Sequence, residues 1–163
     1  MRGKSRYIIG LGNYARDDDS IGLRVVEQIV ERGLDKDFTA VEVGNNGITL
    51  LTYFNDETER ILVVDCACMG KTPGDYLIFS PDDVASKKTV GNISTHEGDI
   101  LKLIELGKQL GDPIPEIKLL AIEPESLGMD MKLSDTLASR LDEYVDAAVC
   151  EIESGPDESK GNI

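Results

Sequence analysis

Apolar runs alternate with amphipathic segments along the chain, as expected when buried strands alternate with helices. Continuous apolar stretches predict strands at residues 6–12 and 60–65, and a shorter stretch predicts a strand at residues 39–43. Between the first strand and residue 39, apolar positions spaced three and four apart predict a helix over residues 20–32. The apolar face of this helix comprises Ile21, Val25, Val26, Ile29 and Val30.

Shorter segments extend this alternation. Residues 48–54 are predicted to form a short helix, and residues 118–122 a strand that ends before Pro124. Residues 75–79 are also predicted as a strand. They follow the strand at 60–65 too closely for a parallel crossover, which favours an antiparallel orientation.

Two further helices are predicted in the second half of the chain. Ser94 and Glu97 have the spacing of a capping box, which indicates a helix start. This helix is expected to direct inward Ile100, Leu103, Ile104 and Leu110. A last helix from Ser134 is expected to group Leu137, Leu141, Val145, Ala148 and Ile152. The whole pattern predicts one α/β domain over residues 1–153, with a mostly parallel sheet covered on both faces and a flexible tail at 154–163.

Charge narrows the classes of partner. The 163 residues carry a formal net charge of −14, and 29% of them are charged. Binding to nucleic acid or to an anionic membrane requires clustered lysine and arginine, so neither partner is expected. Cations, neutral small molecules or a protein with a basic surface remain as partners.

Cysteine content indicates the cellular compartment. Cys66, Cys68 and Cys150 are odd in number and lack the repeated C-x-x-C spacing of a zinc ribbon, which favours free thiols in a reducing cytosol. The apolar runs are too short for a signal peptide or a membrane span. A cytoplasmic protein is therefore expected.

The most informative motif follows the first strand. The glycine turn at residues 10–12 resembles a pyrophosphate-binding turn, and it fits a G-x-G-x-x-A pattern with Glu42 as the ribose-binding acid. However, the next residues include three consecutive carboxylates at 17–19, which would repel a phosphate. Their oxygens suit a divalent cation instead, so a metal site is the preferred interpretation.

Two more residues are expected at the same edge. Asp65 ends an otherwise apolar strand, and His96 is the only histidine. Ligands of such sheets bind at the carboxyl ends of the strands, where Asp65, the acids at 17–19 and the loop with His96 should meet. Asp19 is the preferred ligand of the three acids, whereas Asp18 could bind backbone amides and hold the loop. A helix dipole favours neutral His96, and two carboxylates with an imidazole suit nickel or zinc.

Each of these residues also has an ordinary structural explanation. The acids could form an exposed turn that favours the dipole of the following helix, and Asp65 could cap a strand end. His96 could be a surface residue beside a helix start. The cation site therefore depends on whether the side chains converge.

Four ordered motifs resemble those of the hydrogenase maturation endopeptidases. The family opening, a G-x-G-N turn followed by an acidic pair and a glycine, is matched by residues 10–22. Asp65, followed by Pro73 and Gly74, matches the second motif. Residues 94–97 match the histidine segment, and residues 124–127 match a late P-E-S-L motif. The resemblance covers about residues 6–150.

This resemblance implies a fold and an activity. The fold is a three-layer αβα sandwich with a mixed five-stranded sheet and one antiparallel strand. The activity is that of a metal-dependent endopeptidase, a hydrolase that trims the C-terminal extension of a nickel-iron hydrogenase large-subunit precursor. Asp19, Asp65 and His96 are the implied catalytic and nickel-binding residues. The precursor would supply the nickel, zinc could replace it in vitro, and a monomer is expected.

One segment departs from the family pattern and leaves alternatives open. The family D-G-G-T-x-G segment, linked to substrate handling, is replaced here by residues 42–47, which keep an acid and two glycines. A non-proteolytic, metal-dependent binding partner of a metalloenzyme subunit is therefore one alternative. A peptidyl-tRNA hydrolase is another, because it shares the G-L-G-N opening, but it needs a histidine where this chain has the acids at 17–19.

Overall fold

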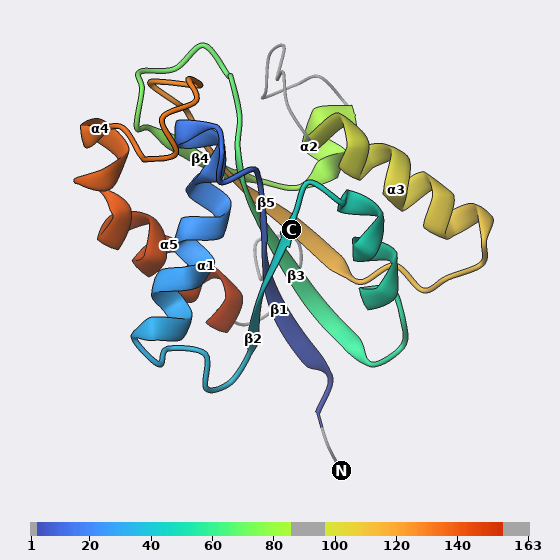
Figure 1. The fold of residues 1–163 in the computed structure, drawn as a ribbon. Helices are drawn as coiled ribbons and strands as arrows, with labels where there is room; N and C mark the ends of the chain where they lie inside the picture. Colours follow the sequence, from blue (N-terminus) through green and yellow to red (C-terminus); the bar gives the residue numbers. More distant parts are fainter. Residues whose placement is uncertain (1–2, 86–96, 155–163) are drawn as a thin grey trace, which may run out of the picture.

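The computed structural model describes residues 3–85 and 97–154. Their strands form one five-stranded sheet in the order β2-β1-β3-β5-β4 (Figure 1). The strands are β1 (Ser5–Leu11), β2 (Thr39–Gly44), β3 (Thr58–Cys66), β4 (Tyr76–Phe79) and β5 (Glu116–Ile122). Strands β2, β1, β3 and β5 pair in parallel, while β4 pairs with β5 in the antiparallel direction. The antiparallel orientation expected for residues 75–79 is confirmed.

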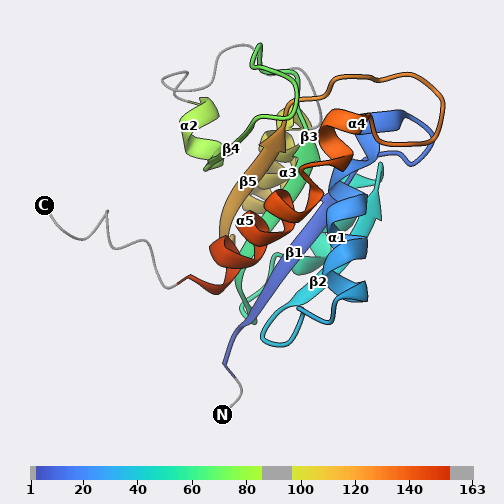
Figure 2. The ribbon, with the colours of Figure 1, turned by 90° about the vertical axis from the view of Figure 1, so that its left-hand side faces the viewer.

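Helices cover both faces of this sheet and make the three layers. One face carries α1 (Ile21–Glu31), α4 (Asp135–Ala138) and α5 (Leu141–Glu153), which Figure 2 shows in front of the strands. The other carries the 3₁₀ helix η2 (Gly47–Tyr53), α2 (Pro81–Ala85) and α3 (Glu97–Gln109). A second 3₁₀ helix, η1 (Asp17–Ser20), leads directly into α1. None of the helices in the described ranges is long and apolar enough to cross a membrane.

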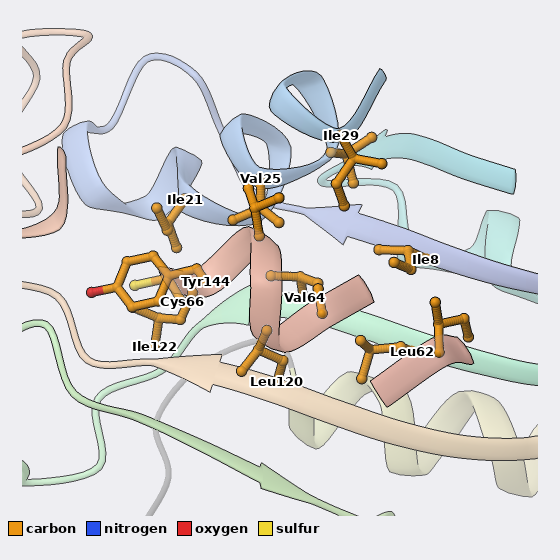
Figure 3. Close-up of a cluster of buried hydrophobic side chains, with 14 of the residues drawn as sticks. Ile8, Ile21, Val25, Ile29, Leu62, Val64, Cys66, Leu120, Ile122 and Tyr144 are labelled. Carbon is orange, nitrogen blue, oxygen red and sulfur yellow. The ribbon is translucent and has the colours of Figure 1, made fainter. Parts of the chain in front are cut away.

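The continuous apolar run in β3 is explained by the two cores. Leu62 and Val64 pack toward α1 and α5, in the cluster shown in Figure 3. Ile61 and Val63 pack toward η2 and α3 on the opposite face. Because successive side chains of a strand point to opposite faces, the central part of a strand between two helical layers, here residues 61–64, is apolar at every position.

A close approach of α1 to the sheet fixes the start of this helix. A Cβ atom on Gly22 would lie 2.2 Å from the carbonyl oxygen of Val64 and 2.4 Å from that of Leu11. Gly10 is equally restricted, because its Cβ would lie 2.4 Å from the carbonyl oxygen of Gly22. Glycine alone permits such backbone contact. The helix therefore begins directly against β1 and β3, and η1 is held at the carboxyl edge of the sheet.

Several details of the predicted helices are wrong. Val30 is 49% exposed and Leu110 is 63% exposed, whereas both were expected to face inward. Val30 lies about 100° around the helix from the buried Ile29, and Leu110 lies in the turn after α3, where Gly111 takes a positive φ. The last helix is interrupted after Ala138, so that α4 and α5 replace one helix, and α2 was not predicted. Ser94 of the predicted capping box lies outside the described residues.

Tyr144 ties α5 to the loop before β4 and gives a test at high pH. Its buried hydroxyl donates a 2.5 Å hydrogen bond to the carbonyl oxygen of Gly74, and burial raises the pKa of Tyr144 to about 12. The free energy of unfolding should therefore fall as the pH rises from 10 toward 12, because the phenol ionises first in the unfolded chain. The variant Tyr144→Phe should lose about 1 kcal/mol near neutral pH. The free energy of unfolding of this variant should also change less with pH above pH 10.

Urea denaturation near neutral pH and at about pH 11 measures both effects. Tyr53→Phe is the matched control, because Tyr53 is only partly buried. An equal loss of stability at high pH in the parent and in Tyr144→Phe would show that ionisation of Tyr144 is not its cause.

Candidate active site

The glycine turn after β1 folds tightly over η1. Gly12 has a φ of 141°, and a Cβ atom there would lie 2.1 Å from the carbonyl oxygen of Asp19. The same carbonyl oxygen accepts a hydrogen bond from the amide of Asn13 at 3.3 Å. The turn therefore places all three acids of η1 at the carboxyl edge of the sheet. The helix α1 begins after the glycine turn, at Ile21, one residue after the predicted start.

Asp18 anchors the loop between β5 and α4. Its fully buried carboxylate accepts hydrogen bonds from the amides of Glu125, Ser126 and Ser134 at 2.8, 2.9 and 2.8 Å. The hydroxyl of Ser134 donates a fourth, also at 2.8 Å. Asp18 thus joins both ends of the loop at residues 125–134 to η1. In Figure 2 the orange loop lies beside the blue turn that precedes α1. The expectation that Asp18 binds backbone amides is confirmed.

Asp17 supports the middle of the same loop. Its carboxylate accepts hydrogen bonds from the Ser126 hydroxyl and the Asp130 amide, each at 2.8 Å. The bond from Ser126 lowers the pKa of Asp17 most, against the opposing effect of burial. Asp17 and Asp18 are both buried, so the alternative of an exposed acidic turn is wrong for these two residues.

Asp19 differs from its two neighbours. Its side chain accepts no hydrogen bond from residues 3–85 or 97–154, although Asp19 as a whole is only 8% exposed. Across the same ranges, every fully buried side-chain oxygen or nitrogen has a hydrogen-bond partner. The carboxylate of Asp19 therefore reaches solvent, and it is available to bind a ligand.

Asp65 lies in the same corner of the fold. It is the penultimate residue of β3, pairs with Ala121 of β5, and is buried. One carboxylate oxygen accepts a 2.8 Å hydrogen bond from the amide of Cys66. Burial raises the pKa of the Cys66 thiol, and the nearby charges of Asp65 and Asp19 raise it further. The element that carries Asp19, η1, contacts β3, so Asp19 and Asp65 lie at the same corner of the sheet.

The third predicted ligand, His96, lies outside the described residues. Among the residues that the structure does describe, no group of three or more histidine, cysteine, aspartate or glutamate side chains is arranged to hold a metal ion. Asp19 and Asp65 therefore stand as two oxygen donors at a shared edge, and the three-residue site stays a prediction. None of Cys66, Cys68 and Cys150 is part of a disulfide bond in the described residues.

Glu123 is a supporting residue that sequence reasoning missed. This buried carboxylate follows β5 and accepts hydrogen bonds from the amides of Met69 and Lys71 at 2.8 and 2.9 Å. Its backbone amide donates to the carbonyl oxygen of Asp75 at 2.8 Å. Glu123 therefore fixes the loop that follows Asp65. The signal was present, because Glu123, like Asp65, is an acid at the end of an apolar strand.

Tyr14 connects the acid turn to the segment that departs from the family pattern. Its hydroxyl contacts the carboxylates of Glu42 and, at 3.2 Å, Glu27. The guanidinium carbon of Arg24 lies 4.9 Å from the centre of the Tyr14 ring, and Arg24 also donates to the carbonyl oxygen of Met131. Burial and the hydrogen bond to Glu42 raise the pKa of Tyr14. Side-chain contacts thus connect the turn at Tyr14 to β2 and α1, and connect α1 to the loop at 125–134.

Comparison with protein families gives a consistent result. A model described as hydrogenase maturation protease matches residues 23–151. The hydrogenase 2 maturation protease of Escherichia coli (strain K12) is 24% identical over 152 residues, covering 91% of this chain and 91% of that protein. The hydrogenase expression/formation protein HupD of Rhodobacter capsulatus is 26% identical over 157 residues, covering 94% of this chain and 74% of that protein.

Solved structures show the same similarity. The NiFe hydrogenase maturation protease HybD from Thermococcus kodakarensis superposes with a TM-score of 0.72 at 27% identity, covering 91% of this chain and 99% of that chain. The hydrogenase maturating endopeptidase HybD from E. coli gives a TM-score of 0.74 at 19% identity, and the match covers 97% of this chain and 94% of that chain. The latter identity supports the shared fold alone.

Proposed function

Because the chain belongs to the hydrogenase maturation protease family, we propose that it removes the C-terminal extension of a nickel-iron hydrogenase large-subunit precursor. The observation that carries this proposal is that the three acids of η1 differ in their hydrogen-bond partners. Asp17 and Asp18 are occupied by the loop at 125–134, whereas Asp19 is left unbonded within the described residues, in an element that contacts the strand of Asp65. A carboxylate of this kind at the ligand-binding edge of an α/β sheet, where a second acid ends the neighbouring strand, is suited to a cation.

In the proposed reaction, Asp19, Asp65 and His96 bind the nickel that the precursor carries. Two carboxylate oxygens and one imidazole are donors that nickel accepts. Bound there, the precursor would be recognised only after nickel insertion, and its scissile peptide would be placed beside the acids. The ion supplies Lewis-acid chemistry, which polarises a carbonyl or activates a water molecule.

The cysteine next to Asp65 supports hydrolysis by water over a thiol nucleophile. Cys66 is buried, and its raised pKa keeps the sulfur in the unreactive thiol form. Water would therefore add to the peptide carbonyl carbon, the C–N bond would break, and the leaving amine would take a proton. The products are the mature large subunit and a free C-terminal peptide.

A mass measurement tests this proposal. The protein is incubated with a nickel-loaded precursor and with the same precursor free of nickel, and the mass of the large subunit is recorded in each case. Trimming is expected only for the nickel-loaded form. Equal trimming of both forms would contradict the nickel-dependent step, and an unchanged mass in both would contradict the peptidase itself.

A non-proteolytic binding partner remains the second candidate, because of the contact between Glu42 and Tyr14. Glu42 stands where the family segment begins with aspartate, and the Tyr14 hydroxyl engages its carboxylate. A residue engaged within the protein has less freedom to contact a substrate. Co-purification of the nickel-loaded precursor without any change in its mass would favour this candidate.

A further inference from the structure

Two exposed apolar side chains share one groove between η2 and α3. Ile48 is 57% exposed and Leu106 is 36% exposed. Together with Leu103 they line a groove of about 360 Å³, and Asn45 and Asn46 lie at its η2 side. Figure 1 shows η2 in teal beside the yellow α3, on the face of the sheet opposite α1. Exposed apolar residues that gather in a concave site are typical of a surface that binds a partner.

The groove begins at the same edge of the sheet that carries Asp19. Its first residue, Asn45, directly follows Gly44 at the end of β2. The carbonyl oxygen of Gly44 accepts a 3.2 Å hydrogen bond from the amide of Gly12. Gly12 belongs to the turn that packs on the backbone of Asp19. The backbone that starts the groove is therefore bonded to the turn that holds the acids.

The charge of the groove indicates which kind of segment can bind there. Lys102 is the only formally charged residue among those described as lining the groove, in a chain whose net charge is −14. Within the described ranges, Lys102 forms neither an ion pair nor a hydrogen bond. A carboxylate on the partner would complement this ammonium group, while the side-chain amides of Asn45 and Asn46 can pair with peptide N–H and C=O groups.

We propose that this groove docks an extended segment of the precursor that places a large apolar side chain against Ile48 and Leu106 and a carboxylate beside Lys102. The inference rests on the proposed function, because it assigns the groove to the same substrate. The groove binds this segment away from the reacting bond. It therefore contributes to affinity for the precursor and to the choice among precursors, not to the chemical step.

The chain offers matched controls for a direct test. Leu106→Asp and Leu110→Asp both place a carboxylate at an exposed leucine at the end of α3, but Leu110 lies outside the groove. Lys102→Glu and Lys108→Glu form a second pair, since Lys108 lines a different depression beside β5. All four positions are on the surface, and circular dichroism checks that each variant is folded.

Binding of a fluorescently labelled, nickel-loaded precursor is measured by anisotropy, and cleavage is measured in parallel. Leu106→Asp and Lys102→Glu should weaken binding roughly tenfold or more and raise KM with kcat unchanged, whereas both control variants should stay within about twofold of the parent. Equal effects of Leu106→Asp and Leu110→Asp, or no effect of either, would overturn the docking site.

The outcomes for the groove and for the proposed function can be told apart. If the parent and Leu106→Asp cleave the precursor with the same KM, the docking role of the groove is rejected and the peptidase activity is supported. Binding that depends on Leu106 without cleavage by the parent would support the groove and reject the peptidase. Failure of the parent to bind or cleave the precursor would reject both.

Discussion

Replacing Asp19 with asparagine should reduce trimming of the nickel-loaded precursor by roughly 100-fold or more, because a neutral amide is a poor substitute for an anionic metal ligand. The fold should be retained. The carboxylate accepts no hydrogen bond within the described residues, so its replacement by an amide breaks no bond that holds the fold. The free energy of unfolding of Asp19→Asn should therefore be no lower than that of the parent.

Two measurements on one preparation check this prediction. The mass of the large subunit reports trimming over time, and urea denaturation reports stability. Asp65→Asn and His96→Ala are expected to abolish trimming in the same way. Normal trimming by Asp19→Asn would remove this residue from the site, and normal trimming by His96→Ala would remove the proposed mechanism.

Replacing Asp18, the neighbour of Asp19, should lower the stability of the fold. Asp18→Ala leaves the amides of Glu125, Ser126 and Ser134 and the hydroxyl of Ser134 without their acceptor. Leaving buried donors unpaired is costly, so the free energy of unfolding should fall by about 3 kcal/mol or more. The loop at 125–134 should lose its attachment to η1, and trimming should decline as a result of this loss of structure.

The matched control is Asp142→Ala, which removes an aspartate whose side chain is 86% exposed and which is only paired with Arg32 on the surface. An exposed ion pair of this kind contributes little, so the control should change stability by less than about 1 kcal/mol. Urea denaturation curves of the parent and both variants are compared at one pH. A similar stability for Asp18→Ala and Asp142→Ala would refute the anchoring role of Asp18.

The strands could be predicted from sequence because their patterns are local. The apolar run at 60–65 required a strand covered on both faces, and the short connection before residues 75–79 favoured the antiparallel orientation that β4 has. The acids at 17–19 and Asp65 were placed at one edge by a general property of parallel sheets. The contact between η1 and β3 agrees with that placement.

Features that depend on distant contacts could not be predicted in the same way. Three consecutive aspartates look alike in sequence, and only the loop at 125–134 shows that two of them are structural and the third is not. The interruption between α4 and α5 coincides with Arg140, whose side chain pairs with Asp75 and Glu143. Leu110 kept the helical spacing, but the helix ends one residue before it. In each case the deciding partner or helix end is absent from the local pattern.

The separation along the chain between Asp18 and its donors has a consequence for biosynthesis. Its contacts with Glu125, Ser126 and Ser134 span 107 to 116 residues. A nascent chain that stops before Glu125 lacks all four donors to Asp18, so η1 lacks the support of the loop at 125–134 while β5 is still inside the ribosome. Because contacts between such remote residues form late, the proposed active centre becomes complete only when synthesis is nearly finished, and a newly made molecule cannot act before its own fold is closed.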